Sequence, residues 1–159
     1  GIADAAIGPF GDPVAARIAS DAGVGARLAL RIGGKVGPLS GDPLDLECTV
    51  IALTSNLVQT GLSGTPTSMG ACALVNAGGI DILLVSLRNQ AIGTDLFTGI
   101  GCTLAAKKLI VVKSSQHFHA SYSKIARHVI YADAPGSVTL DLASLPDRKI
   151  RRPKWPLDA

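Results

Sequence analysis

Two adjacent glycines, Gly78 and Gly79, separate two apolar stretches of the chain, residues 71–77 and residues 80–86. A glycine pair between apolar stretches is typical of a tight β-hairpin, because glycine adopts the positive φ angles of such turns without steric cost. Each stretch has the length of an ordinary strand. The middle of the chain is therefore predicted to be antiparallel β-structure.

Alternation of apolar and polar residues predicts two more strands before this hairpin. In residues 27–32 the leucines and the isoleucine face one side and the two arginines face the other, and residues 44–53 repeat the pattern. The Gly- and Pro-rich segment between them, residues 33–43, is predicted to be a long loop of the kind that often carries function. Residues 63–70 are predicted to form a second, polar loop.

A helix is predicted over residues 13–22. Asp12 precedes it with a carboxylate that can accept hydrogen bonds from free amides, and Pro13 suits the first helical position. Gly23 suits its end. The apolar residues that share one face are predicted to be buried, and these are Val14, Ile18 and Ala22.

The last third of the chain is predicted to contain a βαβ-like unit. Residues 108–112 have the composition of a buried strand, Ser114 and Ser115 can cap a helix, and residues 129–131 resemble a short strand. A further short helix is predicted over residues 139–145. The apolar residues that recur at helical spacing after the serines are Phe118, Tyr122, Ile125 and Val129.

The fold class is thus α+β or mixed α/β, with antiparallel hairpins in the middle, in a single domain over residues 1–159.

Composition narrows the class of protein. The 159 residues are 47% hydrophobic and 17% charged, which excludes a disordered chain. No apolar run approaches the roughly 20 residues of a membrane-spanning helix, so no membrane partner is expected, and residues 1–6 do not resemble a signal peptide. A net charge of +3 is too small to predict nucleic-acid binding. The three cysteines lie far apart and are predicted to be buried, reduced thiols of a cytoplasmic protein, namely Cys48, Cys72 and Cys102.

The segment from Lys113 to His117 is the best candidate site. It follows a predicted strand and opens a predicted helix, whose first amides are unpaired and attract an anion or an oxyanion. Lys113, the hydroxyls of Ser114 and Ser115, and His117 would add donors there. The alternative is a capped helix with a surface lysine and a hydrogen-bonded histidine, and spacing alone leaves both interpretations open.

Arg88 and Gln90, which follow the second strand of the hairpin, form another candidate. An arginine beside amide side chains can grip a carboxylate in a bidentate manner, or it can be a solvated strand end. The basic segment 148–155 is predicted to dock through Trp155 and Ile150 rather than to bind nucleic acid.

The three histidines predict no metal site in this chain. On a helix His117 and His119 point in nearly opposite directions, and His128 lies far along the same helix. Catalytic zinc usually needs three protein ligands. The spacings of a nucleophile elbow and of a P-loop are also absent from the sequence. No cofactor is therefore predicted for this chain itself.

Six segments of the sequence form a recognisable series. They are Gly-Asp-Pro-Val-Ala-Ala at 11–16, Gly-Gly-Lys-Val-Gly-Pro-Leu-Ser-Gly at 33–41, Gly-Gly-Ile-Asp-Ile-Leu-Leu-Val-Ser at 78–86, Val-Val-Lys-Ser-Ser-Gln-His-Phe at 111–118, Tyr-Ala-Asp-Ala-Pro-Gly at 131–136, and Arg-Arg-Pro-Lys-Trp-Pro-Leu-Asp at 151–158. In this order they resemble the C-terminal domain of the MlrC family, metallopeptidases named for microcystin degradation. The resemblance spans nearly the whole chain.

The resemblance implies a piece of a larger bacterial, cytoplasmic hydrolase. Intact family members carry an N-terminal catalytic domain that holds zinc. This chain would then form one wall of the active-site cleft and contact a peptide or small amide substrate. His117 would then stabilise an oxyanion or orient substrate. A second hypothesis stays open, a stand-alone module for small-anion binding or homo-oligomerisation that uses the helix start at Ser114 and Ser115.

Overall fold

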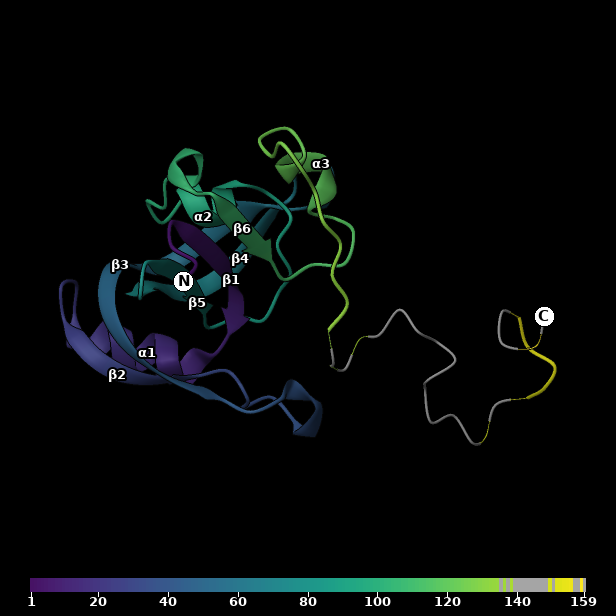
Figure 1. Ribbon diagram of the computed structural model, residues 1–159, viewed down its shortest axis with the longest axis horizontal. Helices are drawn as coiled ribbons and strands as arrows, with labels where there is room; N and C mark the ends of the chain where they lie inside the picture. Colours follow the sequence, from purple (N-terminus) through teal and green to yellow (C-terminus); the bar gives the residue numbers. More distant parts are fainter. Residues whose placement is uncertain (135, 137, 139–148, 150, 156–157, 159) are drawn as a thin grey trace.

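A mixed six-stranded β-sheet organises the chain (Figure 1). The computed structural model describes residues 1–134, 136, 138, 149, 151–155 and 158. Across the sheet the strands follow the order β2-β3-β4-β5-β1-β6. Their bounds are β1 Ala5–Gly11, β2 Arg27–Ile32, β3 Leu44–Thr60, β4 Pro66–Ala77, β5 Ile80–Val85 and β6 Leu109–Val112.

The pairing divides this sheet into an antiparallel and a parallel half. Strands β2 to β5 pair antiparallel, and the tight turn at Gly78 and Gly79 joins β4 to β5, which confirms the predicted hairpin. Strand β1 lies between β5 and β6 and runs parallel to both. The carboxyl ends of β5, β1 and β6 therefore meet at one edge of the sheet, and the predicted α+β class is confirmed.

Helix α1, Pro13–Ala22, covers one face of the sheet (Figure 1). Its start is as predicted, because Asp12 caps it by accepting from the Ala15 amide. The predicted buried face is wrong, since Val14 and Ile18 are 54% and 46% exposed, and Ala22 is exposed too. Short side chains let the helix backbone approach the sheet closely, and the buried residues are Ala15, Ala16 and Ala19.

Two short helices cover the opposite face, α2 over Asp95–Thr98 and α3 over His119–Tyr122 (Figure 1). Both contribute side chains to a second buried cluster, which they share with the sheet. The largest members of that cluster include Leu57, Met69, Leu83, Phe97 and Tyr122. Each face of the sheet thus has its own core.

Several predicted boundaries differ from the structure. Strand β1 was not predicted, because Gly8 and Pro9 interrupt its apolar pattern. The predicted loop over residues 63–70 is a single 3-10 turn at Leu62–Gly64, after which β4 begins at Pro66. Small polar residues therefore continue the hairpin where a loop was expected.

The predicted strand–helix–strand unit near the C-terminus is the largest correction. Strand β6 is an edge strand with Leu109 and Val111 exposed, so the expected full burial is wrong. Helix α3 begins at His119 and spans only four residues, so Ser114 and Ser115 do not cap it. Residues 129–131 form no strand, and the helix predicted over 139–145 lies outside the described residues.

The remaining predictions concern cysteines, the basic tail and membranes. All three cysteines are buried and free, and burial raises the pKa of Cys72 to about 11.

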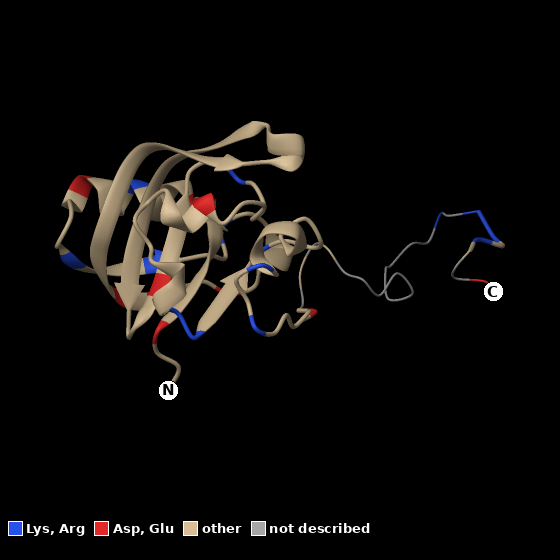
Figure 2. Ribbon diagram, turned by 90° about the horizontal axis from the view of Figure 1, so that it is seen from above, with Lys and Arg blue, Asp and Glu red and all other residues tan. Residues whose placement is uncertain are grey.

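Trp155 is 82% exposed, so the predicted docking of the basic segment through this side chain is wrong, while Ile150 lies outside the described residues. Figure 2 shows Lys and Arg scattered over the domain and gathered again near the C-terminal end of the chain. Among the described residues, no helix has the length and apolar character that crossing a bilayer requires.

Candidate functional site

The predicted site residues lie at the edge where the three parallel strands end. Arg88 and Gln90 follow β5, and Lys113 and Ser114 follow β6. The backbones of these segments are joined, because the Ala91 amide donates to the Lys113 carbonyl at 3.3 Å. Sheets that contain parallel strands commonly bind ligands at the carboxyl ends of those strands. The topology therefore brings two separately predicted candidates to one place.

Three of these side chains form a direct hydrogen-bond chain. The Ser114 hydroxyl donates to Gln90 Oε1 at 3.0 Å, and Gln90 Nε2 lies 2.8 Å from His117 Nδ1. His117 is exposed, whereas Gln90 and Ser114 are half-buried. These hydrogen bonds therefore run from two half-buried side chains to an exposed histidine ring. We call them the Ser114–Gln90–His117 chain.

Two cations flank this chain without contacting it. Lys113 places its ammonium 5.2 Å from the centre of the Phe10 ring, at the end of β1. The Arg88 side chain lies against Gly11, whose added Cβ would meet Arg88 Cγ at 3.0 Å. Neither cation forms an ion pair with any described residue. Both charges are thus exposed and available to an anionic group.

The other predicted donors are arranged differently from the sequence prediction. His117 lies in the turn before α3, so the expected row of helix amides at Ser114 and Ser115 is absent. Ser115 is exposed and makes no side-chain hydrogen bond to a described residue. The first candidate site therefore consists of side chains, not of a helix terminus.

Gln59, which sequence reasoning missed, anchors the loop that carries Gln90. It is fully buried in β3, and its Nε2 donates to the Gln90 carbonyl at 2.8 Å. Its Oε1 accepts from the amides of Ile92 and Gly93 at 2.9 and 3.3 Å. Buried polar groups of this kind are costly unless fully bonded. A glutamine near the end of a long strand carries no sequence signal for this role.

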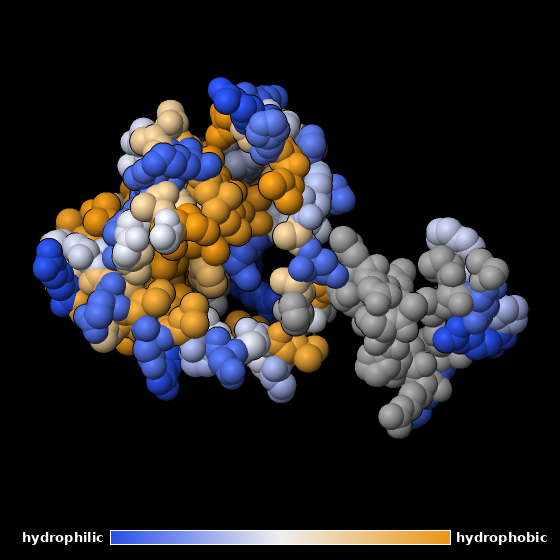
Figure 3. All heavy atoms as spheres, viewed as in Figure 1, coloured by the Kyte–Doolittle hydropathy of each residue, from blue (hydrophilic) through white to orange (hydrophobic). Residues whose placement is uncertain are grey.

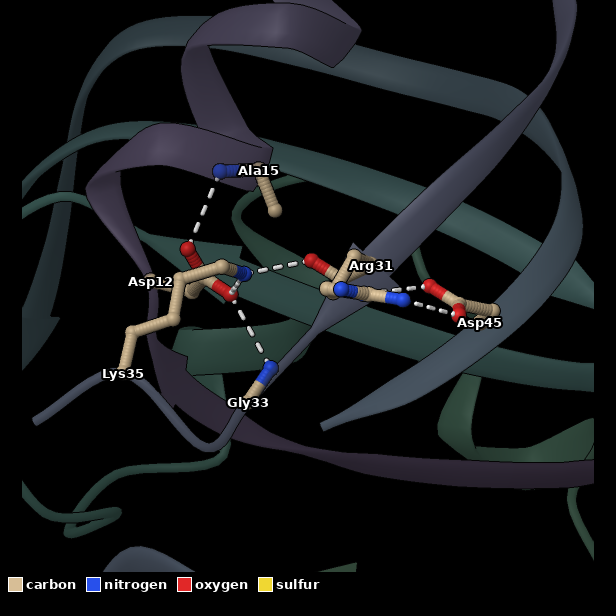
Figure 4. Close-up of polar contacts among 6 residues, drawn as sticks. All are labelled: Asp12, Ala15, Arg31, Gly33, Lys35 and Asp45. Atoms are coloured by element: carbon tan, nitrogen blue, oxygen red, sulfur yellow. Dashed lines mark hydrogen bonds and ion pairs between the residues drawn. The ribbon is translucent and has the colours of Figure 1, made fainter. Parts of the chain in front are cut away.

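Asp12 forms a second polar cluster at the end of β1 (Figure 4). One carboxylate oxygen accepts from the Ala15 amide and the other from the Gly33 amide, each at 3.0 Å. Lys35 forms an ion pair with the same carboxylate and also donates to the Arg31 carbonyl. Asp12 thus ties the long loop that begins at Gly33 to the start of α1.

The charge of Asp12 is stabilised despite its burial. Burial by itself would raise the pKa of Asp12, since it penalises the charged form. The hydrogen bonds from Ala15, Lys35 and Gly33 outweigh that penalty and hold the pKa below its ordinary value of 3.8. The carboxylate therefore remains ionised at neutral pH. This cluster is a fixed structural element beside the candidate site.

A metal centre does not assemble from the described residues. No three His, Cys, Asp or Glu side chains gather within this part of the chain. His119 instead bonds the Tyr131 hydroxyl through Nδ1 at 2.7 Å, and its ring stacks on that tyrosine. The residues that the structure describes therefore do not fit a zinc ion.

A groove of about 560 Å³ lies between α1 and the sheet, apart from the predicted residues. Arg17 and Asp21 line it from the helix and form an ion pair with each other at 2.8 Å. Thr54 and Ser86 line it from the sheet side. None of the predicted site residues lines this groove.

Comparison with known proteins points to one family. The family model described as "MlrC C-terminus" matches residues 1–149. Microcystinase C of Sphingomonas sp. is 34% identical over 152 residues, which are 96% of this chain and 29% of that protein. A solved structure from Mesorhizobium sp. BNC1, named "Putative metallopeptidase", matches with a TM-score of 0.83 and 26% identity, over 97% of this chain and 31% of that chain. The chain thus spans less than a third of each relative.

Proposed function

This chain belongs to the MlrC C-terminus family, and on that premise we propose that it is the C-terminal domain of a zinc-dependent amide or peptide hydrolase. Its relatives are named as a microcystinase and a metallopeptidase, which supports hydrolysis of an amide bond by the larger protein. In this proposal the domain walls the substrate cleft and contributes side chains to it. The observation that carries the proposal is the Ser114–Gln90–His117 chain at the ends of the parallel strands.

His117 is the residue that acts on the reacting group. Attack on an amide carbonyl places negative charge on its oxygen, and a positioned N–H donor stabilises that charge in the transition state. His117 is exposed at the strand ends and is held from behind by Gln90. A donor that is already oriented needs no rearrangement during the reaction. The imidazole therefore stabilises the oxyanion or orients the substrate carbonyl.

Lys113 and Arg88 bind an anionic group of the substrate away from the reacting bond. Both are exposed, and neither is neutralised by an ion pair within the described residues. A guanidinium can hold a carboxylate through two parallel hydrogen bonds, and an ammonium contributes charge without fixed geometry. Peptides and amino-acid amides with a free carboxylate fit this pair.

The zinc of the proposed hydrolase belongs to the rest of the protein. Since no metal-binding cluster occurs among the described residues, the ligands would come from the N-terminal domain. We expect elemental analysis to find zinc in the intact protein and no stoichiometric zinc in the 159-residue chain after dialysis. About one tightly held zinc per isolated chain would mean that a complete zinc site lies in this chain. That result would contradict the proposal that the ligands belong to the N-terminal domain.

The surface of the domain supports packing against such a partner. Strand β6 exposes Leu109 and Val111 at the sheet edge, and Figure 3 shows apolar surface across this face of the molecule. Val14 and Ile18 form a second exposed apolar pair on the outer side of α1. Contiguous apolar surface of this kind is typical of an interface.

Removal of the two cations tests the substrate-binding role. In the intact protein we expect Lys113→Met and Arg88→Met to raise KM for a carboxylate-bearing substrate by roughly 10- to 100-fold, with a smaller change in kcat. A hydrogen bond to a charged group contributes roughly 1.5–3 kcal/mol, and each 1.4 kcal/mol is a factor of ten. The matched control is Lys124→Met, at an exposed lysine outside the site. Unchanged KM in both site variants would contradict the role.

The alternative of a stand-alone anion-binding module loses its structural basis. That hypothesis needed a helix that starts at Ser114 and Ser115, whereas α3 starts at His119 and is too short to offer an anion site.

A further inference from the structure

The side-chain amide of Gln90 lies between the Ser114 hydroxyl and the His117 ring. Its Oε1 accepts from the Ser114 hydroxyl at 3.0 Å, and its Nε2 lies 2.8 Å from His117 Nδ1. An amide nitrogen only donates hydrogen bonds, so Nδ1 must be the acceptor and carry no proton. A neutral imidazole protonated on one nitrogen then has its proton on Nε2.

We infer that Gln90 is a positioning residue, which holds His117 in the Nε2–H tautomer so that the ring offers the substrate a donor and no lone pair. Nδ1 is occupied by Gln90, and Nε2 is the remaining nitrogen of this exposed ring. Its partner must therefore be an acceptor, such as the carbonyl or carboxylate oxygen of the substrate. A general base or a metal ligand needs an unprotonated ring nitrogen that is free to accept. In the Nε2–H tautomer no such nitrogen is free, so His117 can act only as a donor.

Several hydrogen bonds hold the backbone around Gln90. Buried Gln59 bonds the Gln90 carbonyl and the amides of Ile92 and Gly93, which follow it. The Ala91 amide donates to the carbonyl of Lys113, directly before Ser114. The segment that carries Gln90 is thus tied both to β3 and to the residue before Ser114. The backbone is therefore already ordered, and the entropy lost when the amide bridges Ser114 and His117 is that of the side chains alone.

The opposite orientation of the amide makes the opposite prediction. With Oε1 toward His117 and Nε2 toward Ser114, the hydroxyl would accept and Nδ1 would have to donate. Nε2 of His117 would then carry a lone pair, and the ring would suit a base or a metal ligand. Measuring the tautomer of His117 therefore distinguishes the two orientations of the Gln90 amide.

Nuclear magnetic resonance on the ¹⁵N-labelled 159-residue chain tests the tautomer directly. Long-range ¹H–¹⁵N correlation of the ring protons separates protonated from unprotonated nitrogens at a pH well above about 6.5, where an ordinary histidine is neutral. We expect Nε2 of His117 to be protonated and Nδ1 to be unprotonated. A predominant Nδ1–H form would overturn the inference.

Gln90→Glu tests whether Gln90 is the cause, since free histidine itself favours the Nε2–H form. A carboxylate accepts but does not donate, so Nδ1 of His117 is expected to gain a proton in this variant. The control is Gln116→Leu, which removes an exposed amide beside His117 that does not bond the ring, and it should leave both nitrogens as in the wild type. An unprotonated Nδ1 in Gln90→Glu would show that Gln90 does not set the tautomer.

The identity of the acceptor rests on the proposed function, but the tautomer does not. If the tautomer is as inferred and His117 proves dispensable for turnover, the hydrolase role fails and the positioning role of Gln90 stands. If His117 is essential and its Nδ1 is protonated, the hydrolase role stands and the inferred donor role is wrong.

Discussion

Replacing His117 by alanine in the intact protein is expected to lower turnover by roughly 100- to 1000-fold, the usual effect of losing one oxyanion donor. The ring is exposed, and its hydrogen bond goes to one side chain at the surface. The substitution therefore removes the proposed donor without opening a cavity in the core. Zinc content and melting temperature should stay near the wild-type values. Steady-state kinetics, elemental analysis and thermal unfolding measure the three quantities.

Two further variants separate a catalytic from a structural histidine. His117→Gln keeps an N–H donor at this position and is expected to recover part of the lost rate, which a proton-accepting role would not allow. His128→Ala removes another exposed histidine outside the site and should leave turnover unchanged. Wild-type turnover in His117→Ala, or its unfolding, would show that this histidine is structural.

The second large effect is expected at Asp12, whose removal should destabilise the fold by about 2–4 kcal/mol. Asp12→Ala removes the cap of α1, which costs about 1 kcal/mol. It also leaves the Gly33 amide without its acceptor, which costs about 1–3 kcal/mol where that group is shielded from water. Lys35 loses its partner as well, but its side chain is 31% exposed and can turn to water. The midpoint of urea unfolding measures the change, with an unchanged slope.

Asp21→Ala is the matched control for this experiment. Asp21 lies in the same helix and pairs with Arg17, but their side chains are 63% and 77% exposed. Exposed pairs contribute only about 0–1 kcal/mol. Equal destabilisation by Asp12→Ala and Asp21→Ala would contradict the proposed importance of the buried carboxylate.

The contribution of Asp12 should also depend on pH. Because the pKa of Asp12 is lowered in the folded state, its stabilisation is present above the ordinary value of 3.8 and is lost as pH falls through the folded value. The stability difference between wild type and Asp12→Ala should therefore be constant near neutral pH and shrink in acid. A difference that grows as the pH is lowered would have the wrong sign.

Local patterns in the sequence were sufficient for a large part of the fold. The alternation in residues 27–32, the glycine pair at 78 and 79, and the cap at Asp12 each act over a few residues, and all three occur in the structure as predicted. Lys113, Arg88, Gln90 and His117 were recognised as candidates for the same reason, because each follows or flanks a local pattern.

Other local patterns failed where tertiary contacts outweighed them. Phe118 and Tyr122 are buried as helical spacing suggests, yet α3 begins only after Phe118 and ends at Tyr122. Both aromatic side chains pack into the hydrophobic core on that face of the sheet. In α1 the larger apolar residues stay outside, because contact with the sheet favours the alanines. Spacing identifies apolar positions, but the neighbouring layer decides which of them it covers.

The assembly of the site depended on strand order, which no local pattern contains. Gln90 and His117 are 27 residues apart, and they meet only because β1 inserts between β5 and β6 and aligns the ends of these strands. In the same way Lys35 reaches Asp12 across 23 residues of chain. The sequence by itself determined which residues can donate, cap or carry charge, since these are properties of single side chains and short spacings. Only the tertiary structure decided which of them share hydrogen bonds, because that requires the long-range pairing of strands to bring distant segments within about 3 Å of one another.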